Sequence, residues 1–318
     1  MFHSYASENA ILTPAGERLT DVIWVDVENP TAAEEMQIKA AFGIEIPSRE
    51  DMEEIEISSR LYSEGKATYM TAVLPANSDG GDPEMGPVTF ILAENHLVTV
   101  RYHAPRVFST FPPRAIRTRQ EISSAELAMV ALMEAVIDRQ ADILERTARD
   151  IDALSRQIFR AADPDVKRDY QGVLVSVGQM GDLNSNIRDS LLTMDRLIGH
   201  LGQVLSRRDA ETDLRERVRT LANDAKSLTD HAGFVASKIT FVLDASLGMI
   251  SIEQNAIIKI FSVAAVIFLP PTLTASIYGM NFKGMPELSW SYGYAYGIGV
   301  MVLSAILPYL YFKYRNWL

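Results

Sequence analysis

Residues 260–291 read IFSVAAVIFLPPTLTASIYGMNFKGMPELSWS, and residues 292–312 continue as YGYAYGIGVMVLSAILPYLYF. The first 20 residues of this stretch and its last 21 carry no charge. Each uncharged run is long enough to cross the roughly 30 Å hydrocarbon core of a bilayer as a helix. A buried hairpin of a soluble protein is the alternative interpretation, but two such runs joined by a dozen residues indicate two membrane spans.

The charged and aromatic residues that flank the two runs predict their orientation. Lys259 precedes the first run, and Lys313 and Arg315 follow the second, so the positive-inside rule puts both flanks in the cytosol and residues 281–291 outside. The first residues of the chain lack the basic flank and apolar run of a secretory signal, so we expect the N-terminal part in the cytosol as well. Aromatic belts are expected from Trp290, Tyr292 and Tyr294 outside and from Tyr311, Tyr314 and Trp317 inside.

The composition indicates a large soluble part with a small membrane part. The 318 residues are 47% hydrophobic, and a mean hydropathy of +0.02 suits neither a pure membrane bundle nor a disordered chain. The absence of cysteine excludes thiolate metal sites, disulfides and thiol catalysis, and the net charge of -11 disfavours nucleic acid as a partner. The sequence contains no Walker A motif, dinucleotide fingerprint or metalloenzyme spacing, so we expect neither a nucleotide ligand nor an enzyme.

Residues 1–120 are predicted to form an α+β domain. They contain nine of the 14 prolines and read as short strands and helices broken by turns. Residues 77–86, rich in Asp and Gly, are expected to form an exposed loop. An acidic run at residues 50–56 is predicted on a helix, where it is either a solvated face, the commoner case, or a place that holds a cation. The predicted strands are residues 22–27, 67–74, 88–92 and 97–102.

Residues 121–254 are predicted to form long helices, because no proline occurs between Pro164 and Pro270 and helix-forming residues dominate. Three segments show apolar residues at heptad spacing, and Asn184 interrupts the second stripe. The third segment has no convincing stop before the first span, so we expect one helix over residues 213–277, on the order of 100 Å long. The stripes are Val130, Ile137, Leu144, Ile151 and Ile158; Val173, Val177, Met180, Ile187, Leu191, Met194, Ile198, Leu201 and Leu205; and Leu214, Val218, Leu221, Ala225, Leu228, Ala232, Val235, Ile239, Val242 and Met249.

The first span is the candidate for lining a pore. Two spans per chain cannot enclose an aqueous path, since a pair of helices has no interior, so transport would require an oligomer. Pro270 and Pro271 free backbone carbonyls that lipid cannot satisfy, which places this helix against protein or water. One stripe is polar at both ends and apolar in the middle, which suits a hydrophobic gate, although a packing stripe is an alternative at Ala265. The stripe consists of Asn255, Ile258, Phe261, Ala265, Leu269, Thr272 and Ser276.

A short motif follows the first span, where Gly279, Met280 and Asn281 lead into residues 282–288, FKGMPEL. Here the sequence resembles the CorA family of magnesium transport proteins, whose signature is Gly-Met-Asn after the first of two C-terminal spans and a Met-Pro-Glu-Leu loop. The close resemblance runs from about residue 250 to the C-terminus, whereas the N-terminal domain matches in layout alone.

The resemblance implies a funnel-shaped homopentamer in a bacterial inner membrane, with the first spans around the pore and the second spans outside them. It implies a filter at the outer mouth formed by Gly279, Met280 and Asn281, with five amide oxygens from Asn281. Mg²⁺ prefers six oxygen ligands and gives up water reluctantly, so a neutral ring that bonds to its hydration shell can select it. Asn255, Thr272 and Ser276 would then be polar stations, and Ile258, Phe261 and Leu269 would be constrictions.

The same resemblance implies functional roles for acidic residues. Asp244 falls where the family places a stalk carboxylate that shares a regulatory Mg²⁺ with a neighbouring protomer. Glu287 either raises the local concentration of cations at the external loop or pairs with Lys283. The membrane potential would drive influx without a nucleotide. Candidate partners of Asp244 are residues 50–56, Asp79, Asp82 and Glu84.

Two alternatives remain open. Related two-span proteins with another filter tripeptide carry zinc, and cobalt or nickel can pass magnesium channels, so another divalent cation is the first alternative. A membrane-tethered coiled-coil sensor that carries nothing is the second. The predicted parts of the chain are residues 1–120, a cytosolic α+β domain; 121–254, a helical stalk; 255–280, a pore-lining span; 281–291, an external loop; and 292–318, a second span with a cytosolic tail.

Overall fold

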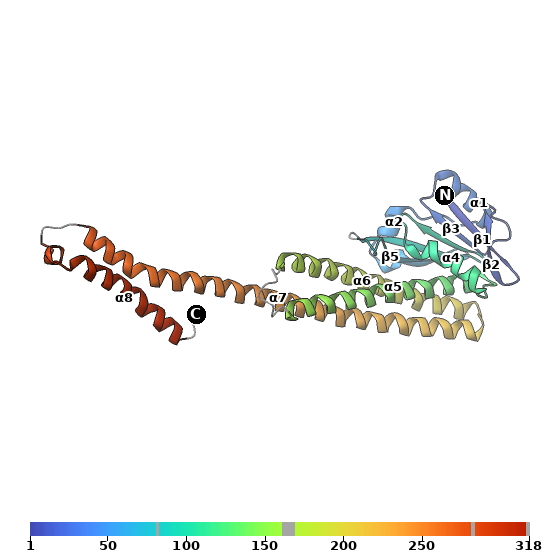
Figure 1. Ribbon diagram of the computed structural model, residues 1–318. Helices are drawn as coiled ribbons and strands as arrows, with labels where there is room; N and C mark the ends of the chain where they lie inside the picture. Colours follow the sequence, from blue (N-terminus) through green and yellow to red (C-terminus); the bar gives the residue numbers. More distant parts are fainter. Residues whose placement is uncertain (81–82, 161–168, 281–283, 316–318) are drawn as a thin grey trace. The chain divides into compact units, whose positions relative to one another are not determined.

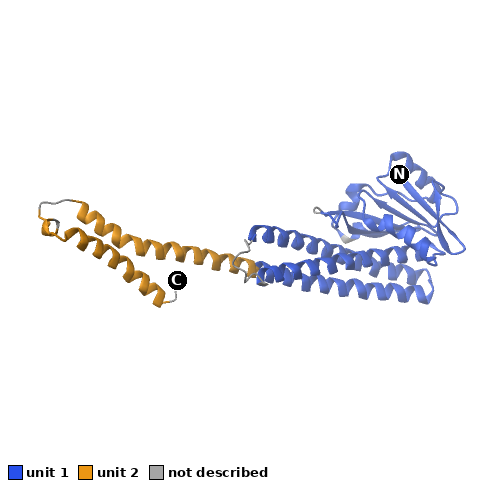
Figure 2. Cartoon of the chain, viewed as in Figure 1, with its two compact units in different colours: residues 1–243 blue, residues 244–318 orange. Residues whose placement is uncertain are grey.

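The computed structural model describes all residues except 81–82, 161–168, 281–283 and 316–318. The chain forms two compact units, residues 1–243 and residues 244–318 (Figure 2). The five-part division expected from the sequence stays a prediction. Five residues that the sequence analysis names lie outside the described residues: Asp82, Pro164, Asn281, Lys283 and Trp317.

The described residues of the first unit form a seven-stranded sheet of order β2-β1-β3-β7-β6-β5-β4 (Figure 1). β3 pairs with β7 in parallel, and the other neighbours are antiparallel. The four predicted strands correspond to β3, β5, β6 and β7, which confirms the mixed α and β character, whereas the sequence patterns do not predict β1, β2 and β4. The strands are β1 Phe2–Glu8, β2 Ile11–Gly16, β3 Trp24–Glu28, β4 Leu61–Glu64, β5 Ala67–Ala76, β6 Glu84–Leu92 and β7 Leu97–Arg101.

Alternate side chains of the central strands enter two cores, one on each face of the sheet. Trp24 and Phe90 belong to the core that also contains side chains of α4, α5 and α6, and their neighbours Val25 and Ile91 belong to the core against α1 and α2. This alternation follows from the period of two in a strand that is buried on both faces. The shorter helices are α1 Ala32–Phe42, α2 Arg49–Glu53, α3 Ile57–Arg60 and α4 Arg106–Thr118.

Three long helices follow the sheet: α5 Ala125–Arg160, α6 Tyr170–Arg207 and α7 Thr212–Gly279. All five residues of the predicted stripe on α5 are buried, and most residues of the other two stripes are buried as well. α7 is one helix of 68 residues, which confirms the predicted continuous helix from the stalk into the first apolar run. The core on one face of the sheet continues between α5, α6 and the first part of α7, so sheet and helices form one compact unit.

Helix α6 is tied to the sheet by hydrogen bonds to the edge of β5. β4 pairs with β5 from Ala67 to Met70, so the backbone of Val73 lies beyond the described partner strand. Thr193 accepts a hydrogen bond from the Val73 N–H at 3.0 Å, and Ser190 donates one to the Val73 carbonyl. These side chains satisfy backbone groups that an uncovered strand edge would expose.

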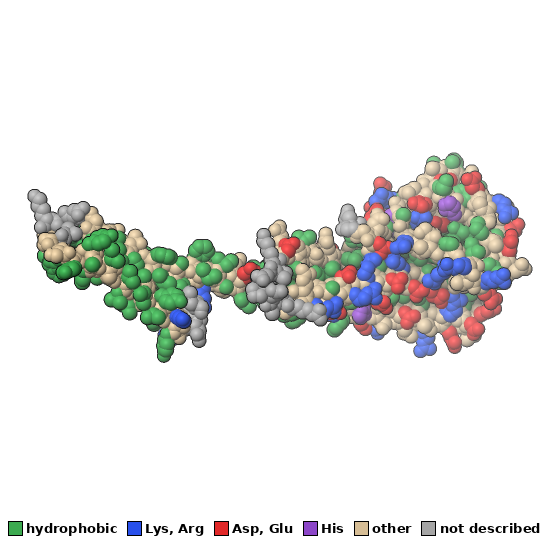
Figure 3. All heavy atoms as spheres, in the orientation of Figure 1, with side chains coloured by type: hydrophobic (Ala, Val, Ile, Leu, Met, Phe, Trp, Pro, Cys, Tyr) green, Lys and Arg blue, Asp and Glu red, His purple; other side chains and the backbone are tan. Residues whose placement is uncertain are grey.

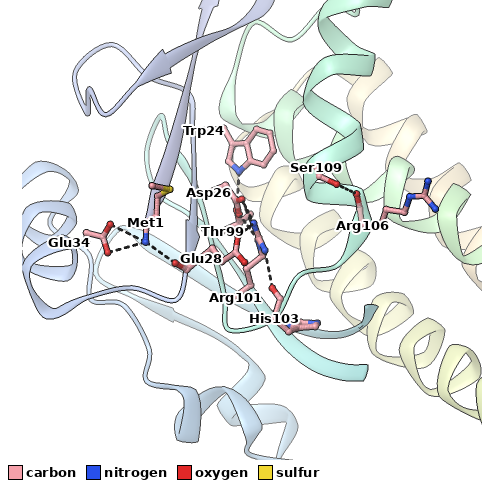
Figure 4. Close-up of polar contacts among 10 residues, drawn as sticks. All are labelled: Met1, Trp24, Asp26, Glu28, Glu34, Thr99, Arg101, His103, Arg106 and Ser109. Atoms are coloured by element: carbon pink, nitrogen blue, oxygen red, sulfur yellow. Dashed lines mark hydrogen bonds and ion pairs between the residues drawn. The ribbon is translucent and has the colours of Figure 1, made fainter. Parts of the chain in front are cut away.

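A buried polar network joins β3 to β7 (Figure 4). Arg101, 5% exposed, donates to Asp26 at 2.9 Å and to Glu28 at 2.9 Å. Thr99 donates to Asp26 at 2.8 Å and accepts a hydrogen bond from the Trp24 indole at 3.1 Å. The bidentate pairing and the added hydroxyl donor compensate the desolvation of both charges, which a buried ion pair requires.

His103, which follows β7, is expected to make the stability of the fold depend on pH. His103 is 7% exposed, its Nε2 lies 2.9 Å from the Leu74 carbonyl, and its Nδ1 has no partner among the described residues. Burial holds the pKa of His103 below its ordinary value; Arg101 and Arg49 lower it further, against the Leu74 carbonyl and Glu84, which raise it. Below about pH 6.5 the unfolded chain therefore binds a proton that the folded chain does not.

We expect the unfolding free energy to fall as the pH drops from about 6.5 to 5, by at most about 1.4 kcal/mol per pH unit from this one group. The thermal midpoint of the intact protein, measured in detergent across this range, should show a weaker pH dependence in His103→Gln than in the wild type. His231→Gln, at an exposed position of α7, is the control for removing a histidine. An equal pH dependence in His103→Gln and the wild type would contradict the prediction.

Replacement of Asn184, the amide that interrupts the apolar stripe of α6, is expected to stabilise the protein. Asn184 is 3% exposed and donates to the Ala232 carbonyl of α7 at 3.1 Å, but its Oδ1 has no partner among the described residues. Asn184→Leu removes this unpaired acceptor, so we expect the unfolding free energy to rise by about 1 kcal/mol. The thermal midpoint measures this change, and Asn223→Leu, at an exposed position of α7, is the matched control. A lower midpoint for Asn184→Leu would show that the single hydrogen bond outweighs the unpaired oxygen.

Candidate functional site

The second unit has the surface of a membrane domain. α7 contains a window of mean hydropathy 2.0, and α8, Gly293–Tyr314, one of 1.7; only 6% of each window is buried. Apolar side chains are the predominant coloured side chains on the visible face of this unit, whereas acidic and basic side chains mix over the first unit (Figure 3). Length, composition and exposure therefore agree with two membrane spans. Exposure of this much apolar surface to water would be energetically unfavourable.

Each of the two apolar helices buries one face. Among the described residues of the second unit, α8 and the short helix η1, Pro286–Ser289, are the elements that can cover α7. Gly297 of α8 is buried. The covered or half-buried residues recur every three or four positions, in places as adjacent pairs: Lys259, Val263, Ala264, Ile267, Pro270, Pro271, Thr274 and Tyr278 on α7, and Gly293, Gly297, Val300, Met301, Ser304, Ala305, Pro308 and Phe312 on α8.

The predicted pore stripe lies on the opposite side of α7. Successive residues of an α-helix are about 100° apart, so Ala265 points about 200° away from the covered Val263, and Leu269 about 200° away from Ile267. Phe261 is 71% exposed and Leu269 67%. The structure thus brings the whole stripe together on one exposed face, away from the face that α8 covers: Asn255, Ile258, Phe261, Ala265, Leu269, Thr272 and Ser276.

Oxygen atoms suited to a hydrated cation stand on this face. The Thr272 hydroxyl donates its proton to the Phe268 carbonyl at 2.7 Å, so the lone pairs of its oxygen remain available as acceptors. Asn255 and Ser276 are exposed at the two ends of the stripe. A water molecule of a hydration shell can donate to each of these oxygens.

The residues of the proposed entrance lie where α7 ends. Gly279 is the last residue of the helix, and Met280, 58% exposed, donates its N–H to the Ile277 carbonyl at 3.2 Å. Asn281 lies outside the described residues. Glu287 is half-buried in η1. The helix therefore delivers the first two residues of the motif to the end of the exposed stripe.

Asp244 is exposed on α7, at the first residue of the second unit. The described part of the chain contains no group of three or more Asp, Glu or His side chains that would hold a metal ion within one protomer. Among the candidate partners of Asp244, Asp51 accepts hydrogen bonds from Ser48, the N-cap residue of α2, and Glu53 pairs with Arg49. Three residues of the acidic run, Glu50, Asp51 and Glu53, lie on the five-residue helix α2, and Glu54 and Glu56 follow its end. Exposed carboxylates remain at Glu50, Glu54, Glu56 and Glu84.

Asp79, another candidate partner, is held by three arginines of its own chain. Its carboxylate pairs with Arg139 at 2.7 Å and also with Arg146 and Arg106. The hydrogen bonds from Arg139 and Arg146 hold the pKa of Asp79 far below its usual range. These arginines stand 27 to 67 positions away, so no local pattern predicts the cluster. Three cations around one carboxylate leave little attraction for a regulatory metal ion.

The comparisons with known proteins agree over nearly the whole chain. The family model described as CorA-like Mg2+ transporter protein matches residues 20–314. Magnesium transport protein CorA of Salmonella typhimurium is 33% identical over 302 residues, which cover 95% of this chain and 94% of that protein. The protein of the same name from Escherichia coli K12 is 32% identical and covers 100% of both chains.

A solved structure shares the fold. The CorA magnesium transporter from Methanocaldococcus jannaschii superposes with a TM-score of 0.78, covering 100% of this chain and 99% of that one at 17% identity. The names of the relatives describe transport proteins, which confirms the expectation that the chain is not an enzyme. With a family match over residues 20–314 and relatives above 30% identity over nearly its full length, the chain belongs to the CorA family of Mg²⁺ transporter proteins.

Proposed function

We propose that this chain forms a homopentameric channel in a bacterial inner membrane, through which the membrane potential drives partly hydrated Mg²⁺ into the cytosol. The exposed stripe of α7, which faces away from α8 and ends at Gly279, carries the proposal. Copies of this stripe around an axis would enclose the aqueous path that a single helix pair lacks. The family match and the names of the relatives support Mg²⁺ as the ion.

The proposed filter is a ring of Gly279, Met280 and Asn281 at the outer mouth. Mg²⁺ holds its six oxygen ligands at about 2.0 to 2.1 Å and exchanges water reluctantly, so hydrogen bonds from neutral amides to its hydration shell favour it without dehydration. A ring of carboxylates would bind the ion more tightly and slow its release. Below the filter, Ser276, Thr272 and Asn255 would hold the hydrated ion, and Leu269, Phe261 and Ile258 would form the constrictions.

The membrane potential supplies enough free energy for influx. Moving one elementary charge through about 100 mV releases about 2.3 kcal/mol, so a divalent cation releases roughly 4.6 kcal/mol. The proposed orientation places the N-terminus and C-terminus in the cytosol, because Lys259, Lys313 and Arg315 flank the spans on that side. No nucleotide takes part in the proposed cycle.

Cytosolic Mg²⁺ is the proposed signal that closes the channel. Asp244 is exposed on α7, and a single protomer offers no complete metal cluster among its described residues. An ion shared between Asp244 and an acidic side chain of the next protomer would offset the repulsion between subunits and favour the closed arrangement. Glu50, Glu54, Glu56 and Glu84 are the exposed candidates for that second ligand.

Replacement of the filter amide tests the transport proposal. Asn281→Ala should lower the initial rate of Mg²⁺ uptake into proteoliposomes by about tenfold or more, the factor that corresponds to a loss of about 1.4 kcal/mol. Asn223→Ala, an exposed amide on the cytosolic part of α7, should leave the rate unchanged. Equal uptake by Asn281→Ala and wild type would reject the filter. Faster uptake of Ni²⁺, Co²⁺ or Zn²⁺ than of Mg²⁺ would assign another cation, and no uptake at all would leave a non-transporting membrane protein.

Replacement of Asp244 tests the regulatory site separately. Asp244→Ala should remove the inhibition of uptake by Mg²⁺ on the cytosolic side, because the shared ion loses one of its ligands. The measurement is the uptake rate as a function of Mg²⁺ added on that side, with Asp224→Ala, an exposed carboxylate on the same helix, as the control. If Asp244→Ala is inhibited at the same concentration as the wild type, the site lies elsewhere.

A further inference from the structure

The turn between η1 and α8 requires a glycine at one position. A Cβ atom built on Gly293, the first residue of α8, would approach the Glu287 carbonyl oxygen far more closely than the 3.0 Å that real Cβ atoms respect. The other described glycines of the second unit have no neighbour within 4 Å of such an atom: Gly248, Gly279, Gly284, Gly297 and Gly299. Gly293 is therefore required by close backbone contact and not by an unusual backbone angle.

Hydrogen bonds and an aromatic contact hold the same turn together. Trp290 donates its N–H to the Glu287 carbonyl at 3.4 Å, and Gly293 donates its N–H to the Trp290 carbonyl at 3.1 Å. The Ser289 hydroxyl donates to the Pro286 carbonyl at 2.7 Å. The rings of Trp290 and Tyr296 meet edge to face, with centroids 5.9 Å apart. Residues 286–296 thus form a small folded motif in which the backbone of Glu287 rests on the start of α8.

The residue held by this motif carries the one acidic charge between positions 279 and 312, where Lys283 is the one basic residue. Glu287 is the one charged residue in the sequence from position 284 to 312. A carboxylate at the edge of a membrane attracts a divalent cation over about one Debye length, roughly 8 Å at physiological salt, so its effect depends on where it is held.

We propose that Gly293 is a positioning residue for cation capture: by letting the Glu287 backbone dock on the first turn of α8, it holds the Glu287 carboxylate at the outer mouth. This inference rests on the proposed function, in which residues 281–291 face the outside. A side chain at position 293 pushes η1 away from α8 and moves the carboxylate with it. The effect is on capture of the ion, while passage through the pore stripe is untouched.

The test compares Mg²⁺ uptake by Gly293→Ala, Glu287→Gln, the double variant and the wild type in proteoliposomes at low ionic strength. Each single variant should raise the half-saturating Mg²⁺ concentration about threefold or more with the maximal rate unchanged, because local ion concentration is what is lost. The double variant should behave as Glu287→Gln, since Gly293 acts through that carboxylate. The differences should fade in about 0.5 M monovalent salt. Gly299→Ala, a glycine near the start of α8 with no neighbour around its Cβ position, is the matched control.

Three results would overturn the inference: a half-saturating concentration in Gly293→Ala equal to that of the wild type, effects of Gly293→Ala and Glu287→Gln that add, or a lower maximal rate alone. Should Gly293→Ala fail to assemble, Tyr296→Leu takes its place, because it removes the ring contact with Trp290 without a steric clash. Wild-type protein that takes up no Mg²⁺ would overturn the proposed function together with this inference. Wild-type uptake with unaltered capture in the variants would overturn this inference alone.

Discussion

The structure depends on the need of every backbone polar group in a membrane for a hydrogen-bond partner other than lipid. Lipid offers no such partner, so the two apolar runs cross the membrane as helices. A pair of helices has no interior that could hold water. α8 covers one side of α7 and leaves the other exposed, with Phe261 and Leu269 about two-thirds exposed or more. In the proposed channel a single chain would therefore present one wall of the path, and further copies would supply the remaining walls.

The surface of α7 changes along its length, from one suited to a soluble core to one suited to lipid. In the first unit the stripe from Leu214 to Val242 is buried against α5 and α6, with polar residues on the outer side. Past Asp244 that cover ends, and apolar residues point outward in most directions. α7 is one continuous helix that begins in the first unit and ends in the second. In the proposed channel this continuity makes a cytosolic ion an effective controller of a distant gate.

Sequence periodicity predicts the long elements well and the long-range contacts poorly. The bounds of α7 fall within two residues of the expected helix because heptad spacing, the absence of proline and the missing stop signal all agree. Strands β1 and β2 are not predicted from the sequence, because polar and apolar residues do not alternate regularly along them. In addition, Pro14 lies within β2, and a proline argues against a strand. The Arg101–Asp26 pair links positions 75 apart, which no local pattern contains. The exposed face of α7 can be predicted from its sequence stripe, whereas the face that α8 covers is seen in the structure alone.

The distribution of polarity along the stripe bears on how the proposed channel closes. From Ile258 to Leu269 the stripe contains no side-chain oxygen, and at about 1.5 Å per residue this interval extends about 17 Å along the helix axis. A cation that keeps its water cannot be stabilised there by the wall, so a narrow apolar interval of this length empties of water and blocks the ion. In the proposed channel, oxygens of Thr272 and Ser276 on the outer side and of Asn255 on the cytosolic side would stabilise the hydrated ion at both ends of that interval. Opening then requires the helices to move apart at Ile258, Phe261 and Leu269, and no ligand has to leave the pore. The ion bound in the cytosolic region is proposed to control that separation from outside the pore, so conduction and regulation use separate sites on one helix.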